Sequence, residues 1–299
     1  MIKAIITFIF GNAFWDYIVD YFDSPQEIIE NTIITLAIVA LIKYLKEKFI
    51  SIDENGNSTN INSHFDASFA LNNIGNYQQA IQECNRAIAL NANDSVAYNN
   101  RGFAYDKIGK YEQAIQDFDT SIRIDPKYVE AYINRGLTYD HLGQYEQALK
   151  NYNLAIKINP NYTEAYNNRG SIHVYIRQYE RAIADFTKAI ELNPNNAVSY
   201  NNRGEAYRRS KKYEQAIQDY TKSIELNNPD PSFVYDNRGL TYYEIGQYDQ
   251  AIKDFNTSIL LNANYANAYN NRGRCYEAIG NMTLAKADFE KARELGYNG

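Results

Sequence analysis

An Asn-Arg-Gly step that returns at a nearly fixed interval constrains the fold of this chain more than any other feature. Its glycine occurs at Gly102, Gly136, Gly170, Gly204, Gly239 and Gly273. By subtraction, the spacings are 34, 34, 34, 35 and 34 residues. A period of this length is typical of solenoids, in which each repeat buries its apolar face only against its neighbours.

Residues 129–162 show what one unit contains. A first helix is predicted by a glycine and tyrosines on one face, and a second by an apolar stripe. Gly143 favours the end of the first helix, and Pro160 stops the second because proline lacks the amide and clashes one turn back. The alanine of the second helix keeps the same period through seven units: Ala80, Ala114, Ala148, Ala182, Ala216, Ala251 and Ala285.

This pattern resembles the tetratricopeptide repeat family from residue 61 to the C-terminus, about four fifths of the chain. The resemblance implies an all-α, right-handed superhelical solenoid of helix-turn-helix units. It also implies a concave groove, lined by the first helices, that holds peptides or protein partners. The predicted units are 61–94, 95–128, 129–162, 163–196, 197–231, 232–265 and 266–299.

Residues 1–50 do not share the repeat, and residues 51–60 read as a polar linker. The apolar segment 1–22 is compatible with a weak signal peptide. Residues 28–45 form a second apolar stretch, either a membrane anchor or a helix that caps the solenoid or self-associates. Its uninterrupted part, residues 32–42, is 11 residues long, whereas a spanning helix needs about 20.

If residues 28–45 cross a membrane, the flanking charges predict the orientation. Lys43, Lys46 and Lys48 lie in or just after the stretch, whereas Asp16, Asp20, Asp23 and Glu27 precede it. The positive-inside rule then places the repeats in the cytoplasm, at the cytoplasmic face of that membrane.

Composition and residue types argue against several functional classes. The net charge of −6 argues against nucleic-acid binding. His64, His141 and His173 have no cluster at ligand spacing, so no metal site is expected. Once the repeats are subtracted, no stretch remains for a catalytic domain. We therefore expect neither an enzyme, a cofactor nor a small-molecule substrate.

Cysteine usage agrees with a cytosolic location of the repeats. Cys84 and Cys275 fall in the first and last units. Units of a solenoid touch only their neighbours, so these two thiols are too far apart to form a disulfide within one chain. A chain without disulfides is compatible with the cytosol.

An asparagine lies two residues before the glycine of each Asn-Arg-Gly step. In family members with asparagine at this place, the side chain points into the groove and hydrogen-bonds the main chain of an extended partner. An amide offers both a donor and an acceptor for this purpose. Asparagine is a mediocre helix former, so its return argues for a role, although a solvated helix face remains the alternative. The row is Asn100, Asn134, Asn168, Asn202, Asn237 and Asn271.

Side chains one turn further along are predicted to set the specificity of the groove. They are Phe103, Leu137, Glu205, Arg208, Leu240, Tyr243 and Arg274. Family members that clamp the C-terminal carboxylate of chaperones carry a lysine one residue before the asparagine in their first unit. No lysine holds that place here, so this mode of binding does not carry over.

Charged residues also recur. In five of the units, an aspartate follows the Asn-Arg-Gly arginine sixteen residues later. We interpret these residues as a structural ladder of exposed ion pairs worth about 0–1 kcal/mol each. A phosphate-binding row is the alternative.

The cluster at residues 208–212 is interpreted as a solvated edge or a contact for an acidic partner. Lys286 and Arg293 replace an apolar stripe, which predicts a polar cap on the last helix.

The resulting hypothesis is a protein–protein interaction scaffold that binds an extended peptide segment, with residues 28–45 as a candidate membrane tether. A self-associating structural protein, joined through its apolar N-terminus, is one alternative. An accessory subunit of an enzyme complex is another.

Overall fold

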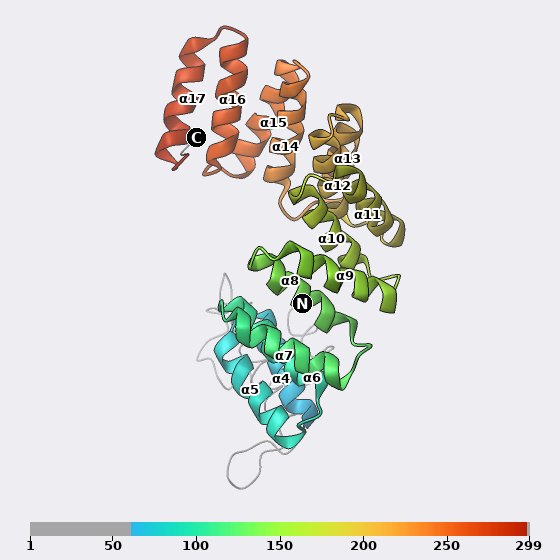
Figure 1. The fold of residues 1–299 in the computed structure, drawn as a ribbon. Helices are drawn as coiled ribbons and strands as arrows, with labels where there is room; N and C mark the ends of the chain where they lie inside the picture. The colour runs from blue at the N-terminus through green and yellow to red at the C-terminus, as the bar shows by residue number, and fades with distance from the viewer. Residues whose placement is uncertain (1–60, 298–299) are drawn as a thin grey trace, which may run out of the picture. The chain divides into compact units, whose positions relative to one another are not determined.

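The computed structural model describes residues 61–297, which fold into helices without a strand in that range (Figure 1). The helices are α4 (Ile61–Asn73), α5 (Tyr77–Leu90), α6 (Ser95–Lys107), α7 (Tyr111–Ile124), α8 (Val129–His141), α9 (Tyr145–Ile158), α10 (Thr163–Tyr175), α11 (Tyr179–Leu192), α12 (Ala197–Arg209), α13 (Tyr213–Glu225), α14 (Pro231–Glu244), α15 (Tyr248–Leu261), α16 (Ala266–Ala278) and α17 (Met282–Glu294). The predicted all-α solenoid of helix pairs is confirmed.

The chain divides into two compact units, residues 1–104 and 105–299. In the first unit, α4 packs against α5, and the Asn72 amide donates to the carbonyl of Asn100 at 3.1 Å. In the second unit, α8 pairs with α9, α10 with α11, α12 with α13, α14 with α15 and α16 with α17. Each second helix also packs against the first helix of the next pair.

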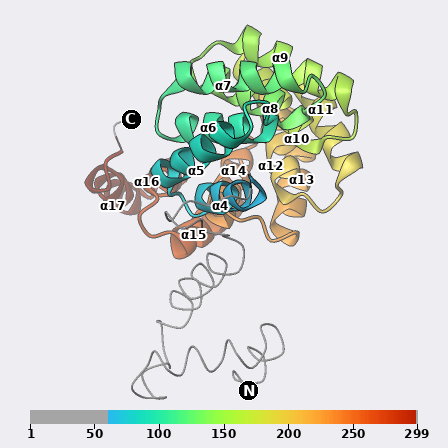
Figure 2. The same cartoon turned by 90° about the horizontal axis from the view of Figure 1, so that it is seen from below.

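The first helices of the second unit form its inner layer. α8 contacts α10, α10 contacts α12, α12 contacts α14 and α14 contacts α16. Figure 2 shows α10 and α12 on the inner side of α11 and α13. The inner layer is therefore built from the helices that carry the asparagine row.

In the pairs from α8 to α17, the repeated glycine lies against an aromatic ring of the second helix. A Cβ atom added to Gly136 would lie 2.6 Å from Cε1 of Tyr152, and one added to Gly204 would lie 2.9 Å from the Tyr220 ring. Tyr152 and Tyr220 are fully buried. The repeated glycines therefore lie where the two helices of a pair meet with no room for a side chain.

Gly136→Ala should overpack the third repeat and lower the free energy of unfolding by about 1–3 kcal/mol. Neighbouring repeats share their interfaces, so hydrogen exchange should accelerate in α8 and α9 and in the helices that flank them. Glu146→Ala, on the exposed face of α9, is the control. Equal acceleration in α16 and α17 would contradict nearest-neighbour coupling.

The turn inside each pair requires a left-handed residue. Gly143 has φ +70°, and the Gln144 amide donates to the Tyr139 carbonyl at 2.8 Å, which closes a Schellman-type end to α8. The fourth and fifth repeats keep the same turn without glycine, since Arg177 has φ +61° and Lys211 φ +62°. The packing of the pair therefore imposes this backbone conformation on residues that disfavour it.

Arg177→Gly should raise the free energy of unfolding by roughly 0.5–1 kcal/mol, because relief of the left-handed strain exceeds the entropy that glycine adds to the unfolded chain. Denaturant unfolding of parent and variant measures this difference. The control Lys150→Gly, on the exposed face of α9, should instead cost about 1 kcal/mol. A loss of stability in both variants would contradict strain at residue 177.

The turns between pairs are closed by asparagine or aspartate rather than by proline alone. The Asn159 side chain accepts from the amide of Asn161 at 3.0 Å. Asn262, which has no proline beside it, accepts from the amide of Asn264 at 3.1 Å. These Asx turns end the second helices, so Pro160 reinforces a stop that its neighbour already makes.

From α8 onward, each arginine of the repeated step clamps three helices. Arg169 of α10 donates to Asp185 of α11, with Nε–Oδ2 at 2.9 Å and Nη2–Oδ1 at 2.5 Å. Its Nη1 donates to Asn153 of the preceding α9 at 2.6 Å, and its guanidinium lies 5.6 Å from the centre of the Tyr166 ring. Arg203, Arg238 and Arg272 make the corresponding bidentate pairs with Asp219, Asp254 and Asp288.

The predicted ladder exists, but it is less exposed than the sequence suggested. The paired aspartates are buried and the arginines are largely covered. Arg135 departs from the pattern, because it donates to Asn151 in its own repeat and pairs with Asp119 of α7. Removing one partner of such a covered pair leaves an unpaired charge, which costs more than the loss of a surface pair.

The last helix presents charge on its outer side. The Lys286 side chain is 79% exposed, and Arg293 is exposed and donates to the carbonyl of Phe289. The predictions for residues 1–50, including the membrane helix at 28–45, lie outside the described residues. No helix within 61–297 is long and apolar enough to cross a membrane.

Candidate partner-binding face

The candidate site is the inner face, which we define as the side chains that α8, α10, α12, α14 and α16 present away from their second helices. Four of the predicted asparagines lie half-buried there, at positions 134, 168, 202 and 271. Asn237 is buried, and so is Asn100 in the first unit. The row is therefore not a freely solvated helix face.

Three asparagines of the row donate to the preceding repeat. The Asn237 amide donates to Oδ1 of Asn201 at 3.3 Å, and the Asn271 amide donates to Oδ1 of Asp236 at 3.1 Å. In the first unit, the Asn100 amide donates to Oγ of Ser68 at 3.3 Å. These side chains set the register between neighbouring first helices.

Asn168 and Asn202 differ from these three. Within residues 61–297, the Asn168 side chain takes part in no hydrogen bond, and Asn202 uses only its oxygen, which accepts from Asn201 at 3.2 Å. Both amide N–H groups therefore remain available on the inner face of α10 and α12.

The predicted specificity residues fall into two groups. Leu137, Leu240 and Tyr243 pack partly against the core of their repeats, and Phe103 is half-buried in the first unit. Tyr243 lies beside Tyr248, with ring centres 5.6 Å apart, and the exposed Arg274 guanidinium lies 4.6 Å from the Tyr243 ring. Tyr243 and Arg274 thus form an aromatic–cation pair that joins α14 and α16.

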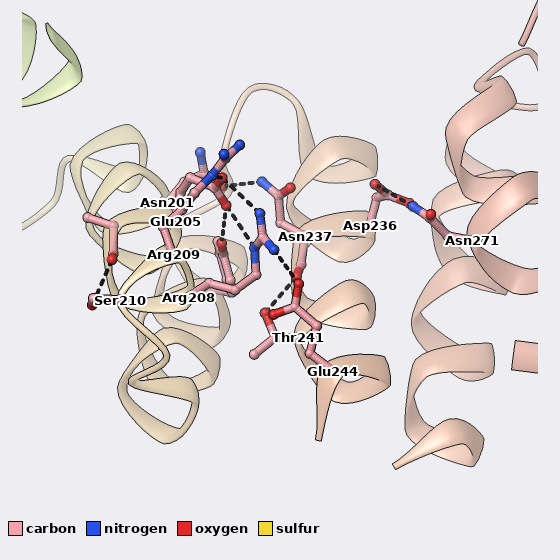
Figure 3. Close-up of polar contacts among 12 residues, drawn as sticks. Asn201, Glu205, Arg208, Arg209, Ser210, Asp236, Asn237, Thr241, Glu244 and Asn271 are labelled. Atoms are coloured by element: carbon pink, nitrogen blue, oxygen red, sulfur yellow. Dashed lines mark hydrogen bonds and ion pairs between the residues drawn. The ribbon is translucent and has the colours of Figure 1, made fainter. Parts of the chain in front are cut away.

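Arg208 belongs to a covered ion network (Figure 3). Its Nε and Nη2 donate to Glu205 at 3.0 and 2.9 Å, and its Nη1 donates to Glu244 of the next repeat at 2.5 Å. Glu205 also accepts from Tyr220 at 3.0 Å and from Arg209 at 2.6 Å. Arg208 therefore joins the fifth and sixth repeats.

The charges of this network hold each other ionised. Burial alone would raise the pKa of Glu205, but the hydrogen bonds and charges of Arg208 and Arg209 outweigh it and lower that pKa. The same contacts raise the pKa of Arg208 against the effect of its own burial. Lys212 makes a loose pair with Glu180, at 3.8 Å.

Asp236 is the buried carboxyl group of the inner layer, with 4% of its surface exposed. It accepts from Asn271 and, at 3.5 Å, from the hydroxyl of Tyr265. Burial raises the pKa of Asp236 to about 6, against the opposing effects of these two donors and of Arg208. Above that pH the fold retains a buried charge.

Asp236→Asn should stabilise the protein at pH 8 and lose this advantage as the pH falls. A raised folded-state pKa means that ionised Asp236 costs stability as the pH rises through about 6. The variant should therefore gain about 1–3 kcal/mol at pH 8 over the parent and little at pH 4. Denaturant unfolding at both pH values measures the difference, and an equal effect at both would contradict a titrating Asp236.

The histidines give no metal site in the described part of the chain, where no group of three His, Cys, Asp or Glu side chains is placed to hold an ion. His173 is buried, as its core position predicts, and burial lowers its pKa against the opposing charge of Asp185. His141 Nδ1 lies 3.0 Å from Asp106.

Family models described as tetratricopeptide repeat or TPR repeat match residues 61–94, 95–128, 129–162, 163–196, 186–218, 239–280 and 266–295. The chain belongs to the tetratricopeptide repeat family. Repeats of this family are in general non-catalytic, and membership supports a role as a protein–protein interaction scaffold. A comparison with curated protein sequences gives no match.

Solved structures share the fold. A tetratricopeptide repeat protein from Parabacteroides merdae is 24% identical, with a TM-score of 0.62 over 80% of this chain and 94% of that one. YrrB, described as a TPR protein with an unusual peptide-binding site, is 20% identical, with a TM-score of 0.51 over 62% of this chain and 95% of that one. A chain of the APC/C hetero-tetramer Cut9–Hcn1 is 19% identical, with a TM-score of 0.68 over 87% of this chain and 49% of that one.

The sequence analysis missed the bonds between repeats that involve Asn201 and Asp236. A signal was available, because both residues directly precede an asparagine of the row and lie 36 and 35 residues before their partners. Polar residues at this spacing in a buried helix layer predict contacts between repeats.

Proposed function

We propose that this protein is a scaffold that holds an extended peptide segment of a partner protein against the inner face of α8, α10, α12 and α14. The observation that carries this proposal is the pair of unused amide groups on Asn168 and Asn202. Two N–H donors at the same place in successive repeats suit the carbonyl groups of an extended main chain.

Two further features support the proposal. Tetratricopeptide repeats in general serve protein binding, and YrrB, which shares the fold, is described as having a peptide-binding site. The side chains around Asn168 and Asn202 also vary from repeat to repeat, with Leu137, Ser171 and Glu205 at the same place. A constant amide beside variable neighbours fits main-chain binding combined with side-chain selection.

Peptides selected by display on the full chain test this function. Asn168→Ala combined with Asn202→Ala should weaken the selected peptide by roughly 5- to 150-fold, because each lost hydrogen bond is worth about 0.5–1.5 kcal/mol. Circular dichroism should show unchanged helix content, since alanine favours helices.

Gln218→Ala, on the exposed face of α13, is the matched control and should bind like the parent. Unchanged peptide affinity in the folded double variant would place the binding surface outside the asparagine row.

We also propose that residues 28–45 tether the repeats to the cytoplasmic face of a membrane. The apolar run at 32–42 and the lysines at 43, 46 and 48 support this orientation. The full chain should then remain with membranes through a salt wash and leave them in detergent, whereas a variant without residues 28–45 should not sediment with membranes. Release of the full chain by salt alone would contradict the tether.

A further inference from the structure

His173 of α10 is a buried histidine at a place where other repeats carry tyrosine. Only 7% of its surface is exposed, so its imidazole is more completely covered than the corresponding phenol groups. A polar ring in this position is costly unless its nitrogens find partners. The corresponding tyrosines, each half-buried, are Tyr105, Tyr139, Tyr207, Tyr242 and Tyr276.

The two ring nitrogens of His173 have different surroundings. Nε2 lies 3.7 Å from Oδ2 of Asp185 on α11. Nδ1 is buried and has no hydrogen-bond partner within residues 61–297. A neutral imidazole carries a single N–H group, which the Asp185 side of the ring can accommodate. A second proton would create an N–H group on Nδ1 for which the fold supplies no acceptor, and it would be a charged one.

The polar groups of α10 and α11 around His173 are already engaged with each other. The Asp185 carboxylate accepts from Nε and Nη2 of Arg169, at 2.9 and 2.5 Å. The Gln178 side-chain oxygen accepts from Nη1 of Arg181 at 3.0 Å. Burial, together with the charges of the two arginines, lowers the pKa of His173 against the effects of Asp185 and Gln178.

The other helices that pack against α10 are α8, α9 and α12. Arg135 of α8 pairs with Asp119, and Arg203 of α12 pairs with Asp219. Asn153 of α9 accepts from the α10 arginine. The aspartates bound by the neighbouring arginines are therefore already paired, and the carboxylate that lies against the His173 ring is the one already clamped within its own repeat.

We propose that His173 makes the fourth repeat a pH-sensitive link in the solenoid. At neutral pH the uncharged imidazole leaves Asp185 to Arg169, and α10 and α11 stay together. Protonation places an imidazolium with an unpaired N–H in the interior, and this ion is more stable when the two helices separate and water reaches Nδ1. Acid therefore opens the fourth repeat in preference to the others. Because α10 carries Asn168, the opened form lacks part of the inner face.

Linkage gives the direction of the effect. A folded-state pKa below the ordinary value means that the unfolded chain binds the proton more tightly than the folded one. The stability of the fourth repeat is therefore complete above about pH 6.5, the pKa of a free histidine, and is lost as the pH falls below it.

The sixth repeat should respond in the opposite sense. The pKa of its Asp236 is raised to about 6, so protonation stabilises that repeat as the pH falls. Opposite responses in two repeats of one chain distinguish a link at His173 from general acid denaturation.

Hydrogen exchange of the full chain at pH 7.5 and pH 5 tests the link, with rates converted to opening constants so that the intrinsic pH dependence of exchange is removed. The opening constants of α10 and α11 should rise at least about threefold at pH 5, whereas those of α14 and α15 should not rise. His173→Tyr, which restores the residue of the other repeats, should abolish the rise. His141→Gln is the matched control, because the His141 side chain is 40% exposed, and should leave it unchanged.

An equal rise in α10, α11, α14 and α15, or a rise in α10 and α11 that persists in His173→Tyr, would overturn the link. His173→Phe, a second ring that does not titrate, decides the matter if the tyrosine variant is poorly folded. In the parent, the ring-proton NMR signal that these variants lose should titrate with a midpoint below about 6.5, and a midpoint at or above that value would also overturn it. The link is independent of peptide binding, so either proposal can fail alone.

Discussion

The clamp made by each Asn-Arg-Gly arginine is the interaction on which the second unit depends. One guanidinium bonds the aspartate of its own second helix, reaches the second helix before it and stacks on a tyrosine of its own first helix. The arginine thereby fixes the rotation of the first helix about its axis. The asparagine one residue earlier is then turned away from the second helices, toward the inner layer.

This geometry makes the inner face a preorganised surface. Glycine against an aromatic ring sets the distance within each pair, and the bonds from Asn237 and Asn271 set the register between pairs. A ligand that binds Asn168 and Asn202 therefore meets side chains whose positions are already determined, which lowers the entropy cost of binding.

The sequence predicted the helix pairs because their signals are local and periodic. Residues equivalent to Gly136, Ala148 and Tyr152 recur in the following units. The packing inferred for one repeat therefore also applies to its neighbours. The arginine–aspartate pairs were also predicted from their constant spacing, although their burial was not, since burial depends on how the pairs stack. The left-handed backbone at Arg177 was not predicted, because tertiary packing there overrides the local preference.

The candidate site was less predictable than the fold. The asparagine row was found from its recurrence, but its division into structural and available members depends on what stands one repeat away, as with Asn201 and Asp236. Arg208 was predicted to face a partner, whereas the network with Glu205 and Glu244 covers it.

Hydrogen exchange of the full chain with and without a selected peptide tests the central claim most directly, namely that the arginine clamps leave the inner face as the binding surface. Binding should slow exchange in α8, α10, α12 and α14, whose amides lie under the ligand, more than in α9, α11 and α13. Slowing confined to α9, α11 and α13 would contradict the account, because it would place the ligand on the outer layer.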